Sequence, residues 1–301
     1  MAAFFTIIIW GTTFISTKIL LTTFNPIEIL FYRFVIGFTT LLLVYPHKLK
    51  VKEKKHELYF MFAGLSGVTL YFLFENIALT YTLASNVGVI ISIAPFFTAI
   101  MAHYFINGEK LKKNFCVGFI CAILGIILIS FNGGAVLKLN PIGDVLAIFA
   151  STLWAVYSIL TKKISTFGYN TIQTTRRIFF YGLIFMIPAL FFLDFKMDVS
   201  RLFNPIDLLN IGYLGFGASA LCFVTWNFSV KVLGAVKTSV YIYLVPVITV
   251  ITSVIILNES ITLISLLGTI LTIAGLIVSE GNLKRRNNIG YKRNEVCNGD
   301  R

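Results

Sequence analysis

The stretch that decides the fold of this chain occurs twice, once in each half. Residues 93–111 read IAPFFTAIMAHYFINGEKL, and residues 244–261 read LVPVITVITSVIILNESI. Both place a proline, Pro95 or Pro246, inside a long apolar run, and both then reach a glutamate beside a glycine or an asparagine. A proline inside a helix removes one backbone hydrogen bond and kinks or breaks the helix. The two stretches therefore predict a repeated unit that contains an irregular helix.

The surrounding sequence is too apolar for a water-soluble protein. Of its 301 residues, 57% are hydrophobic and 13% are charged, and the mean hydropathy is +0.86. A soluble domain carries roughly 25% charged residues and needs only one apolar stripe on each helix. Apolar runs such as residues 117–131 do not alternate, which excludes the strands of a membrane barrel. We therefore predict an all-α integral membrane protein.

Ten stretches are long and apolar enough to span a bilayer, which takes roughly 20 residues in a helix. They are residues 4–23, 27–45, 58–78, 85–106, 115–132, 142–161, 172–193, 208–228, 237–257 and 263–280. The first stretch contains Lys18 and follows no charged leader, so we do not expect a cleaved signal peptide. We expect residues 283–301 to form a basic, disordered cytoplasmic tail.

Most of the lysines and arginines that give the net charge of +12 lie in the segments that connect or follow these stretches. If the N-terminus is cytoplasmic, the cytoplasmic segments hold 18 of the 25 lysines and arginines, and the external segments hold three, Lys138, Lys196 and Arg201. This asymmetry is the one that the positive-inside rule describes. It predicts a multi-pass protein of the cell membrane, such as a bacterial inner membrane, with both termini in the cytoplasm. The basic charge thus indicates topology and contact with anionic lipid rather than a nucleic-acid partner.

The two halves match along their whole length at an offset that drifts from 144 to 151 residues. The matched pairs are Trp10 and Trp154, Thr17 and Thr161, Lys18 and Lys162, Arg33 and Arg177, Gly64 and Gly215, Asn76 and Asn227, Ala84 and Ala235, Pro95 and Pro246, Glu109 and Glu259, Gly118 and Gly268, and Gly125 and Gly275. We interpret residues 1–132 and 142–282 as two copies of a five-helix unit. Because five is odd, the second copy must enter the membrane from the opposite side, which predicts an inverted repeat of the kind found in secondary transporters.

Several motifs in this repeat resemble those of one family. They are IIIWGTTFISTK at residues 7–18, NPIEILFYRFVIG at 25–37, the stretch at 77–111, GFICAILGIILI at 118–129 and their second-half counterparts. From about residue 3 to 282 the chain resembles the EamA-type carriers of the drug/metabolite transporter superfamily. The resemblance implies export of a small solute such as an amino acid, a sugar, a nucleotide-linked metabolite or a cationic drug. It also implies that the third, fourth, eighth and ninth helices line a central cavity, with the fifth and tenth peripheral.

Polar and aromatic groups at membrane depth are the candidates for the site. An aromatic-walled pocket suits a flat or cationic solute, and each proline frees a carbonyl four residues earlier, at Ile91 or Ile242, for a solute or for cavity water. The alternative is that the prolines are structural kinks or hinges and that the asparagines only join helices. The candidate cavity residues are Trp10, Glu75, Asn76, Tyr81, Trp154, Tyr157, Trp226, Asn227, Tyr241 and Tyr243, with Pro95 and Pro246 as hinges.

Glu75 is the most informative of these residues, because an ionisable group inside an apolar helix is costly and indicates function. It could bind a proton or a substrate cation, or it could be an interfacial acid that pairs with Lys18 or Arg33. Trp226 stands at the position that matches Glu75, so the site is not predicted to hold a symmetric pair of acids. We also expect structural pairing among Lys18, Glu28 and Arg33 in the outer half of the first two helices.

The sequence favours a secondary-active, alternating-access exporter of small metabolites such as amino acids, with or without coupling to a proton. One alternative is an uncoupled facilitator or antiporter of a nucleotide-linked metabolite, and another is a non-transporting scaffold or sensor. Because the sequence shows no phosphate loop, no nucleophile–base spacing and no metal spacing among its four cysteines, we expect neither an enzyme nor a metal or cofactor site. The expected partners are a small solute and the lipid bilayer, for a monomer or a homodimer.

Overall fold

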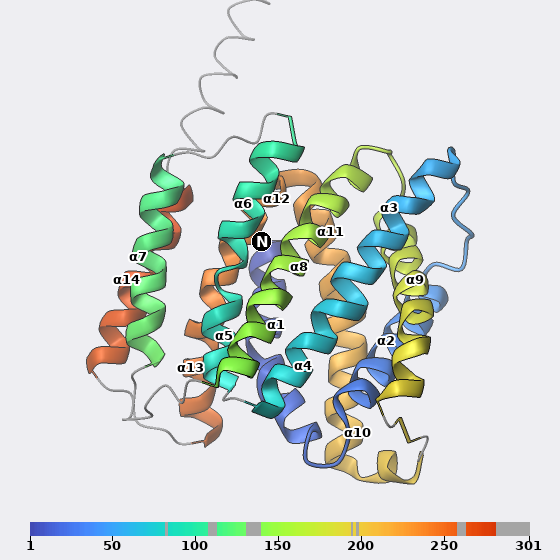
Figure 1. The fold of residues 1–301 in the computed structure, drawn as a ribbon, viewed down its shortest axis with the longest axis horizontal. Helices are drawn as coiled ribbons and strands as arrows, with labels where there is room; N and C mark the ends of the chain where they lie inside the picture. The colour runs from blue at the N-terminus through green and yellow to red at the C-terminus, as the bar shows by residue number, and fades with distance from the viewer. Residues whose placement is uncertain are drawn as a thin grey trace, which may run out of the picture.

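All regular elements in the described part of the computed structural model are helices (Figure 1). The structure describes residues 1–81, 84–107, 113–130, 140–193, 195–196, 199–257 and 263–280. The predicted tail at residues 283–301 therefore lies outside the described residues, as do Glu109 and Glu259 of the two repeated stretches.

The two halves contain the same α-helices and one π-helical segment each in the same order, and the described part of the second half has two additional 3₁₀ turns. The first half consists of α1 (Ala2–Leu20), α2 (Pro26–Val44), α3 (Lys54–Gly64), the π-helical segment η1 (Leu65–Leu70), α4 (Tyr71–Tyr81), α5 (Ala84–Ile91), α6 (Ala94–Phe105) and α7 (Lys113–Ser130). The second half consists of α8 (Pro141–Ser165), α9 (Thr171–Phe192), the short 3₁₀ turn η3 (Val199–Phe203), α10 (Pro205–Gly212), the π-helical segment η4 (Tyr213–Leu221), α11 (Cys222–Leu233), α12 (Ala235–Val240), the 3₁₀ turn η5 (Tyr241–Tyr243), α13 (Leu244–Leu257) and α14 (Leu263–Glu280).

The lengths of these helices agree with a membrane protein. Six described helices are long and apolar enough to cross a bilayer, including the continuous runs Lys54–Tyr81 and Pro205–Leu233. Three shorter apolar helices and the broken helix α5–α6 occupy the remaining predicted spans. Large apolar side chains such as Ile120, Phe191 and Leu267 are exposed on the outside of the bundle, where lipid tails would surround them.

Several of these helices begin at an Asn-Pro pair. The Asn140 side chain accepts hydrogen bonds from the backbone N–H groups that start α8, and Asn204 does the same for α10. At α2, Asn25 forms a capping box with Glu28. The following proline lacks the N–H that would have no partner in the first turn of a helix. These caps define the start of the helices at the membrane surface.

The two repeated stretches form equivalent breaks. α5 ends at Ile91, a turn follows, and Pro95 lies in the first turn of α6. In the second half the 3₁₀ turn η5 precedes α13, and Pro246 lies in its first turn. A proline in a first turn does not remove a helical hydrogen bond of the new helix. The prolines thus mark the point at which each helix restarts.

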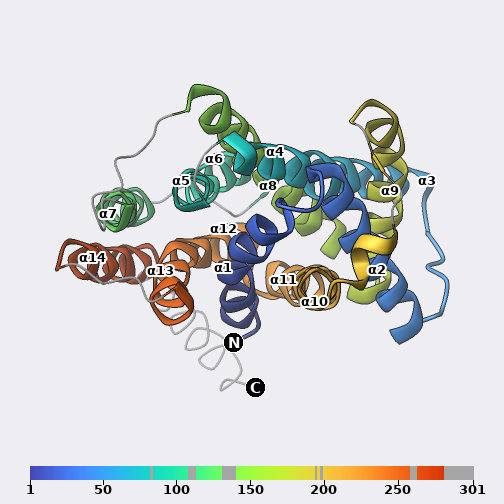
Figure 2. The ribbon, with the colours of Figure 1, turned by 90° about the horizontal axis from the view of Figure 1, so that it is seen from below.

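Contacts between the halves are reciprocal. α1 packs against α11 and α13, and α8 packs against the corresponding elements of the first half, α4 and α6. α7 and α14 pack on each other at one edge of the bundle, as both views show (Figures 1 and 2). A Cβ atom added to Gly125 would lie 2.5 Å from the Gly268 carbonyl oxygen, and one added to Gly275 would lie 2.6 Å from the Gly118 oxygen. The glycines with seven-residue spacing therefore serve close packing of α7 against α14, as their spacing predicts.

Candidate functional site

A small central cavity lies where elements of both halves meet. Its volume is about 40 Å³, which is room for only a few water molecules. A metabolite could therefore bind only if the lining helices moved apart. The cavity is lined by Trp10, Thr13 and Phe14 of α1, Arg33 of α2, Tyr71, Phe72 and Glu75 of α4, Ile91 of α5, Trp154 of α8, Ile242 of η5 and Val245 of α13.

Two of the lining residues carry opposite charges. Glu75 is 6% exposed, and its Oε2 atom has no hydrogen-bond partner among the described residues. Arg33 is 2% exposed; its Nε–H donates to Ser219 Oγ at 3.1 Å, and its guanidinium carbon lies 4.3 Å from the centre of the Phe72 ring. The two groups interact electrostatically, but no ion pair within 4.0 Å joins them among the described contacts. The cavity therefore contains a buried basic group and a buried acidic group that do not contact each other directly.

Aromatic rings form much of the wall. The repeat-matched residues Trp10 and Trp154 meet with ring centroids 5.2 Å apart, nearly perpendicular to each other. Trp226 packs behind both, at 5.0 Å from Trp10 and 5.8 Å from Trp154. The Trp10 indole N–H donates to the carbonyl of Ala218, whereas the buried Nε1 of Trp154 has no partner in the described structure. Trp154 thus retains an unused donor beside the cavity.

The two residues that precede the prolines by four positions both line this cavity. Ile91 stands at the end of α5, and Ile242 stands in η5. The helix breaks therefore lie at the cavity. Because proline cannot donate to the carbonyl four residues before it, backbone carbonyls at these breaks are candidates for contact with a solute or with water.

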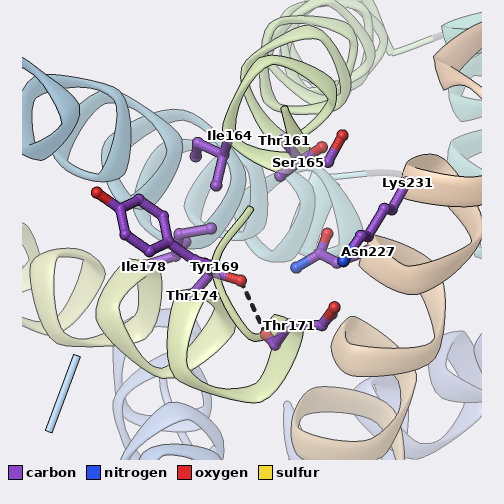
Figure 3. Close-up of a pocket in the computed structure, with 9 residues that line it drawn as sticks. All are labelled: Thr161, Ile164, Ser165, Tyr169, Thr171, Thr174, Ile178, Asn227 and Lys231. Atoms are coloured by element: carbon purple, nitrogen blue, oxygen red, sulfur yellow. Dashed lines mark hydrogen bonds between the residues drawn. The ribbon is translucent and has the colours of Figure 1, made fainter. Parts of the chain in front are cut away.

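A second pocket lies at one end of α8, between α8, α9 and α11 (Figure 3). It has a volume of about 20 Å³, and five of its nine lining residues carry a hydroxyl group. Its residues are Thr161, Ile164, Ser165, Tyr169, Thr171, Thr174, Ile178, Asn227 and Lys231. Asn227 and Lys231 approach from α11, across the pocket from Thr161 and Ser165 of α8 (Figure 3).

A chain of side chains connects the two pockets. Trp154 of the central cavity packs on Tyr157, with ring centroids 5.0 Å apart. The Tyr157 hydroxyl donates to Asn227 Oδ1 at 2.8 Å, and Asn227 Nδ2 donates to Thr175 Oγ1 at 3.0 Å. A solute that passed from one pocket to the other would have to displace this buried layer.

The lysine-containing loop between α2 and α3 contacts Tyr169, a lining residue of the second pocket. The Tyr169 hydroxyl accepts a hydrogen bond from the backbone N–H of Lys52 and is bonded to His56 Nδ1, each at 2.8 Å. His56 also stacks on Phe167, and Arg176 donates to the carbonyls of Tyr45 and His47. The connection between α2 and α3 is thereby fastened to the start of α9.

The structure distributes the other candidate residues over different environments. Asn76 donates to the Pro26 carbonyl at 3.1 Å and does not line either pocket. Tyr81 is 48% exposed. Tyr243 is buried on the side of α7, 6.4 Å from the Phe119 ring, and Tyr241 packs at the edge of the main core. Of the ten candidate cavity residues, the central cavity therefore takes Trp10, Glu75 and Trp154, and the second pocket takes Asn227.

The expected pairing among Lys18, Glu28 and Arg33 is wrong. Glu28 is fully buried and accepts two hydrogen bonds from Arg201, at 2.9 and 3.1 Å, together with one from the Lys196 backbone N–H. Lys18 donates to the Leu79 carbonyl, and Arg33 faces the cavity. The error arose because Arg201 is distant in sequence and reaches Glu28 only when the start of α2 and the turn η3 come together.

Several lining residues were not among the candidates. Tyr71 and Phe72 stand four and three positions before Glu75, and Thr13 and Phe14 stand three and four positions after Trp10. Residues three or four apart share a face of a helix. This spacing, counted from Glu75 and Trp10, could have identified them. The resemblance also implied that the third, fourth, eighth and ninth membrane helices line the cavity. The third, fourth and ninth do so, through α4, α5, η5 and α13, whereas the eighth, Pro205–Leu233, contributes no residue to this lining. The first, second and sixth membrane helices, α1, α2 and α8, line it instead.

Comparisons with known proteins agree with this architecture. The profile of the EamA-like transporter family matches residues 1–131 and 141–280, once in each half. An uncharacterized transporter of Archaeoglobus fulgidus is 31% identical over 278 residues, which cover 91% of this chain and 94% of that protein. A protein of Escherichia coli named as a probable amino-acid metabolite efflux pump is 26% identical over 94% of this chain and 95% of its own length. A solved crystal structure has a similar fold, with a TM-score of 0.73 over 92% of this chain and 96% of that chain at 18% identity.

The family match covers nearly the whole chain and confirms the resemblance that the sequence motifs predict. The members of this family are transporters and not enzymes. The chain is a multi-pass membrane protein that belongs to the EamA-like transporter family.

Proposed function

We propose that this protein is a secondary-active, alternating-access exporter of small metabolites such as amino acids. The observation that carries the proposal is the central cavity, which elements of both halves line and at which the matched tryptophans Trp10 and Trp154 meet. A binding site between two equivalent halves can open to either side when one half tilts against the other. The name of the Escherichia coli relative supports amino-acid metabolites as the solute class.

In this proposal, residues 1–132 and 142–282 are inverted copies of one five-helix unit, related by a twofold axis in the membrane plane. The reciprocal packing of α1 and α8 supports such an axis, and an odd number of spans in each copy requires the inversion. The charge asymmetry supports a cytoplasmic location for both termini. In this arrangement the central cavity, where the matched tryptophans meet, lies near the axis at the middle of the membrane.

The orientation can be tested by cysteine labelling in intact cells. A membrane-impermeant maleimide should label Asn140→Cys, at the start of α8, and should not label Lys52→Cys, in the connection between α2 and α3. Labelling of Lys52→Cys without permeabilisation would reverse the orientation.

Transport itself is tested with proteoliposomes that are preloaded with a panel of amino acids, amines, sugars and organic acids. We expect amino acids to leave faster from vesicles that contain the protein than from empty vesicles. Release that is insensitive to pH gradients would favour an uncoupled facilitator, and release that requires a solute outside would favour an antiporter. If no solute of the panel leaves, the proposed function is wrong.

Coupling to a proton would require a group that titrates during the cycle. Glu75 is the acidic residue that lines the central cavity. If it carries the proton, Glu75→Gln should make the rate of transport independent of pH, since glutamine has a similar shape and does not titrate. An unchanged pH profile would exclude Glu75 as the coupling site.

A further inference from the structure

We propose that Arg33 and Glu75 bind the two opposite charges of one zwitterionic solute. The Arg33 guanidinium would take a carboxylate, the Glu75 carboxylate would take an ammonium group, and the apolar remainder of the solute would lie against the aromatic wall. This proposal rests on the proposed function and specifies which class of solute the central cavity selects.

The first reason is the unusual state of Glu75. A carboxylate at membrane depth is normally paired, and even the two acids in the first turns of α2 and α3 are paired. Glu28 is bound by Arg201 through two hydrogen bonds, and Glu57 by Arg177 at 2.6 and 3.2 Å. Glu75 is nearly as buried as Glu28 and more buried than Glu57, yet one of its oxygens has no partner in the described structure. The solute is the partner that this oxygen lacks.

The second reason is the state of Arg33. Of its five N–H groups, the described hydrogen bonds use the one at Nε, which binds Ser219. Its guanidinium carbon lies 4.3 Å from the centre of the Phe72 ring, so the ring restricts where the group can lie. A guanidinium with its two terminal nitrogens available offers the geometry that binds a carboxylate through two parallel hydrogen bonds. Arg33 is thus prepared for a carboxylate that Glu75 does not supply.

The third reason is the effect of two such charges on selectivity. A zwitterion compensates both buried charges at once, whereas an amine or an acid alone leaves one of them without a partner. Burying an uncompensated charge is strongly unfavourable. A site built to bind two groups therefore rejects solutes that lack one of them, typically by a factor of about 100 or more.

The walls indicate the rest of the solute. Trp10, Trp154, Tyr71, Phe72 and Phe14 surround the two charges with rings. Such a surface suits an aliphatic or aromatic side chain rather than a polyol or a phosphate ester. The solute that fits all three observations is an α-amino acid with an apolar side chain.

The test uses three labelled solutes that share one side chain: phenylalanine, phenethylamine and 3-phenylpropionate. Initial rates of release are measured from proteoliposomes at pH 7 with the membrane potential clamped. We expect the wild-type protein to prefer phenylalanine over both others by about 100-fold. Glu75→Gln should shift preference toward the acid 3-phenylpropionate, because it removes the negative charge that this acid leaves without a partner. Arg33→Gln should shift preference toward phenethylamine, because it removes the positive charge that this amine leaves without a partner.

The control is Glu57→Gln, the same change in a half-buried carboxyl group outside the cavity. It should leave the order of preference unchanged, since Glu57 contacts Arg177 and Tyr181 and lines neither pocket. Arg33→Lys keeps the positive charge but loses the two parallel N–H donors of the guanidinium. We expect this variant to keep the preference for phenylalanine at a reduced rate. Size-exclusion chromatography establishes which variants fold.

The double variant Arg33→Gln/Glu75→Gln separates binding from mere charge compensation, and it also serves if a single variant does not fold. If the two residues bind the solute, the double variant folds but loses discrimination among the three solutes. If they only compensate each other, the double variant keeps the preference of the wild-type protein, and the proposal is overturned. Transport of the panel without a preference for zwitterions overturns this proposal alone, whereas absence of any transport overturns the proposed function.

Discussion

Gly125 on α7 offers the sharpest test of how this fold holds together. A Cβ atom at this position would lie 2.5 Å from the Gly268 carbonyl oxygen and 2.6 Å from the backbone nitrogen of Thr272, both on α14. Ordinary van der Waals contact begins at 3.4 Å. Because both neighbours are backbone atoms, they cannot rotate away, and α7 and α14 must separate by roughly 0.9 Å to accept an alanine.

The expected loss can be worked from this displacement. A gap of 0.5–1 Å forfeits roughly a quarter to a half of the dispersion attraction between the surfaces, and packing drives helix association in lipid because water-based hydrophobic association is absent. Overpacking of this kind costs about 1–3 kcal/mol. Alanine also favours the helix over glycine by up to about 1 kcal/mol, which partly hides the loss.

Gly88→Ala is the matched control. It places the same substitution in helix α5, where a Cβ atom would meet no atom within 4 Å. The gain in helix propensity is common to both variants, so their difference isolates the packing loss at Gly125. We expect Gly125→Ala to be less stable than Gly88→Ala by about 1–3 kcal/mol.

The measurement is reversible unfolding in mixed detergent–SDS micelles, followed by tryptophan fluorescence. Because α7 and α14 contribute no described residue to either pocket, the ratio of rates for different solutes should stay unchanged in folded Gly125→Ala. Equal stability of the two alanine variants, within about 0.5 kcal/mol, would show that the helices do not pack as closely as described, and the reasoning would be wrong.

Two further substitutions test buried polar contacts outside the central cavity. Glu28→Gln should lower the free energy of unfolding by about 1.5–3 kcal/mol, because it removes the charge from a two-bond contact with Arg201; an unchanged midpoint of thermal unfolding would contradict this. Asn227→Ala should cost about 1–3 kcal/mol, because the buried hydroxyls of Tyr157 and Thr175 both lose their bond to Asn227. We expect the double variant Asn227→Ala/Tyr157→Phe to regain part of that stability in the same unfolding assay, because it removes the hydroxyl left without a partner. Strict additivity of the two changes would argue against the hydrogen bond between Tyr157 and Asn227.

The sequence by itself determined the class of protein and its repeated construction. An apolar content of 57% cannot be hidden in one water-soluble core, and the paired positions of Trp10 and Trp154 or of Pro95 and Pro246 recur in register. These properties are visible without a structure because they depend on composition and on order along the chain. They also led to the family that the comparisons show.

The rotation of each helix about its axis could not be predicted in the same way. A helix in lipid is apolar all round, so its sequence lacks the amphipathic stripe that identifies the inward face of a soluble helix. Tyr81 and Tyr243 were candidates because the resemblance places their helices around the cavity, yet Tyr81 is half exposed and Tyr243 packs toward α7. For Glu75 the cost of a charge in lipid supplied the missing information.

Only the tertiary structure decided which partners meet. Arg33 and Glu75 are 42 positions apart and line one cavity because α2 and α4 pack together, whereas Glu28, on the same helix as Arg33, finds Arg201 from the other half. Charge attraction is not specific to one partner, so sequence alone leaves several pairings with similar energies. The packing of helices excludes all but one of these pairings, and it leaves Glu75 and Arg33 facing the same cavity without direct contact.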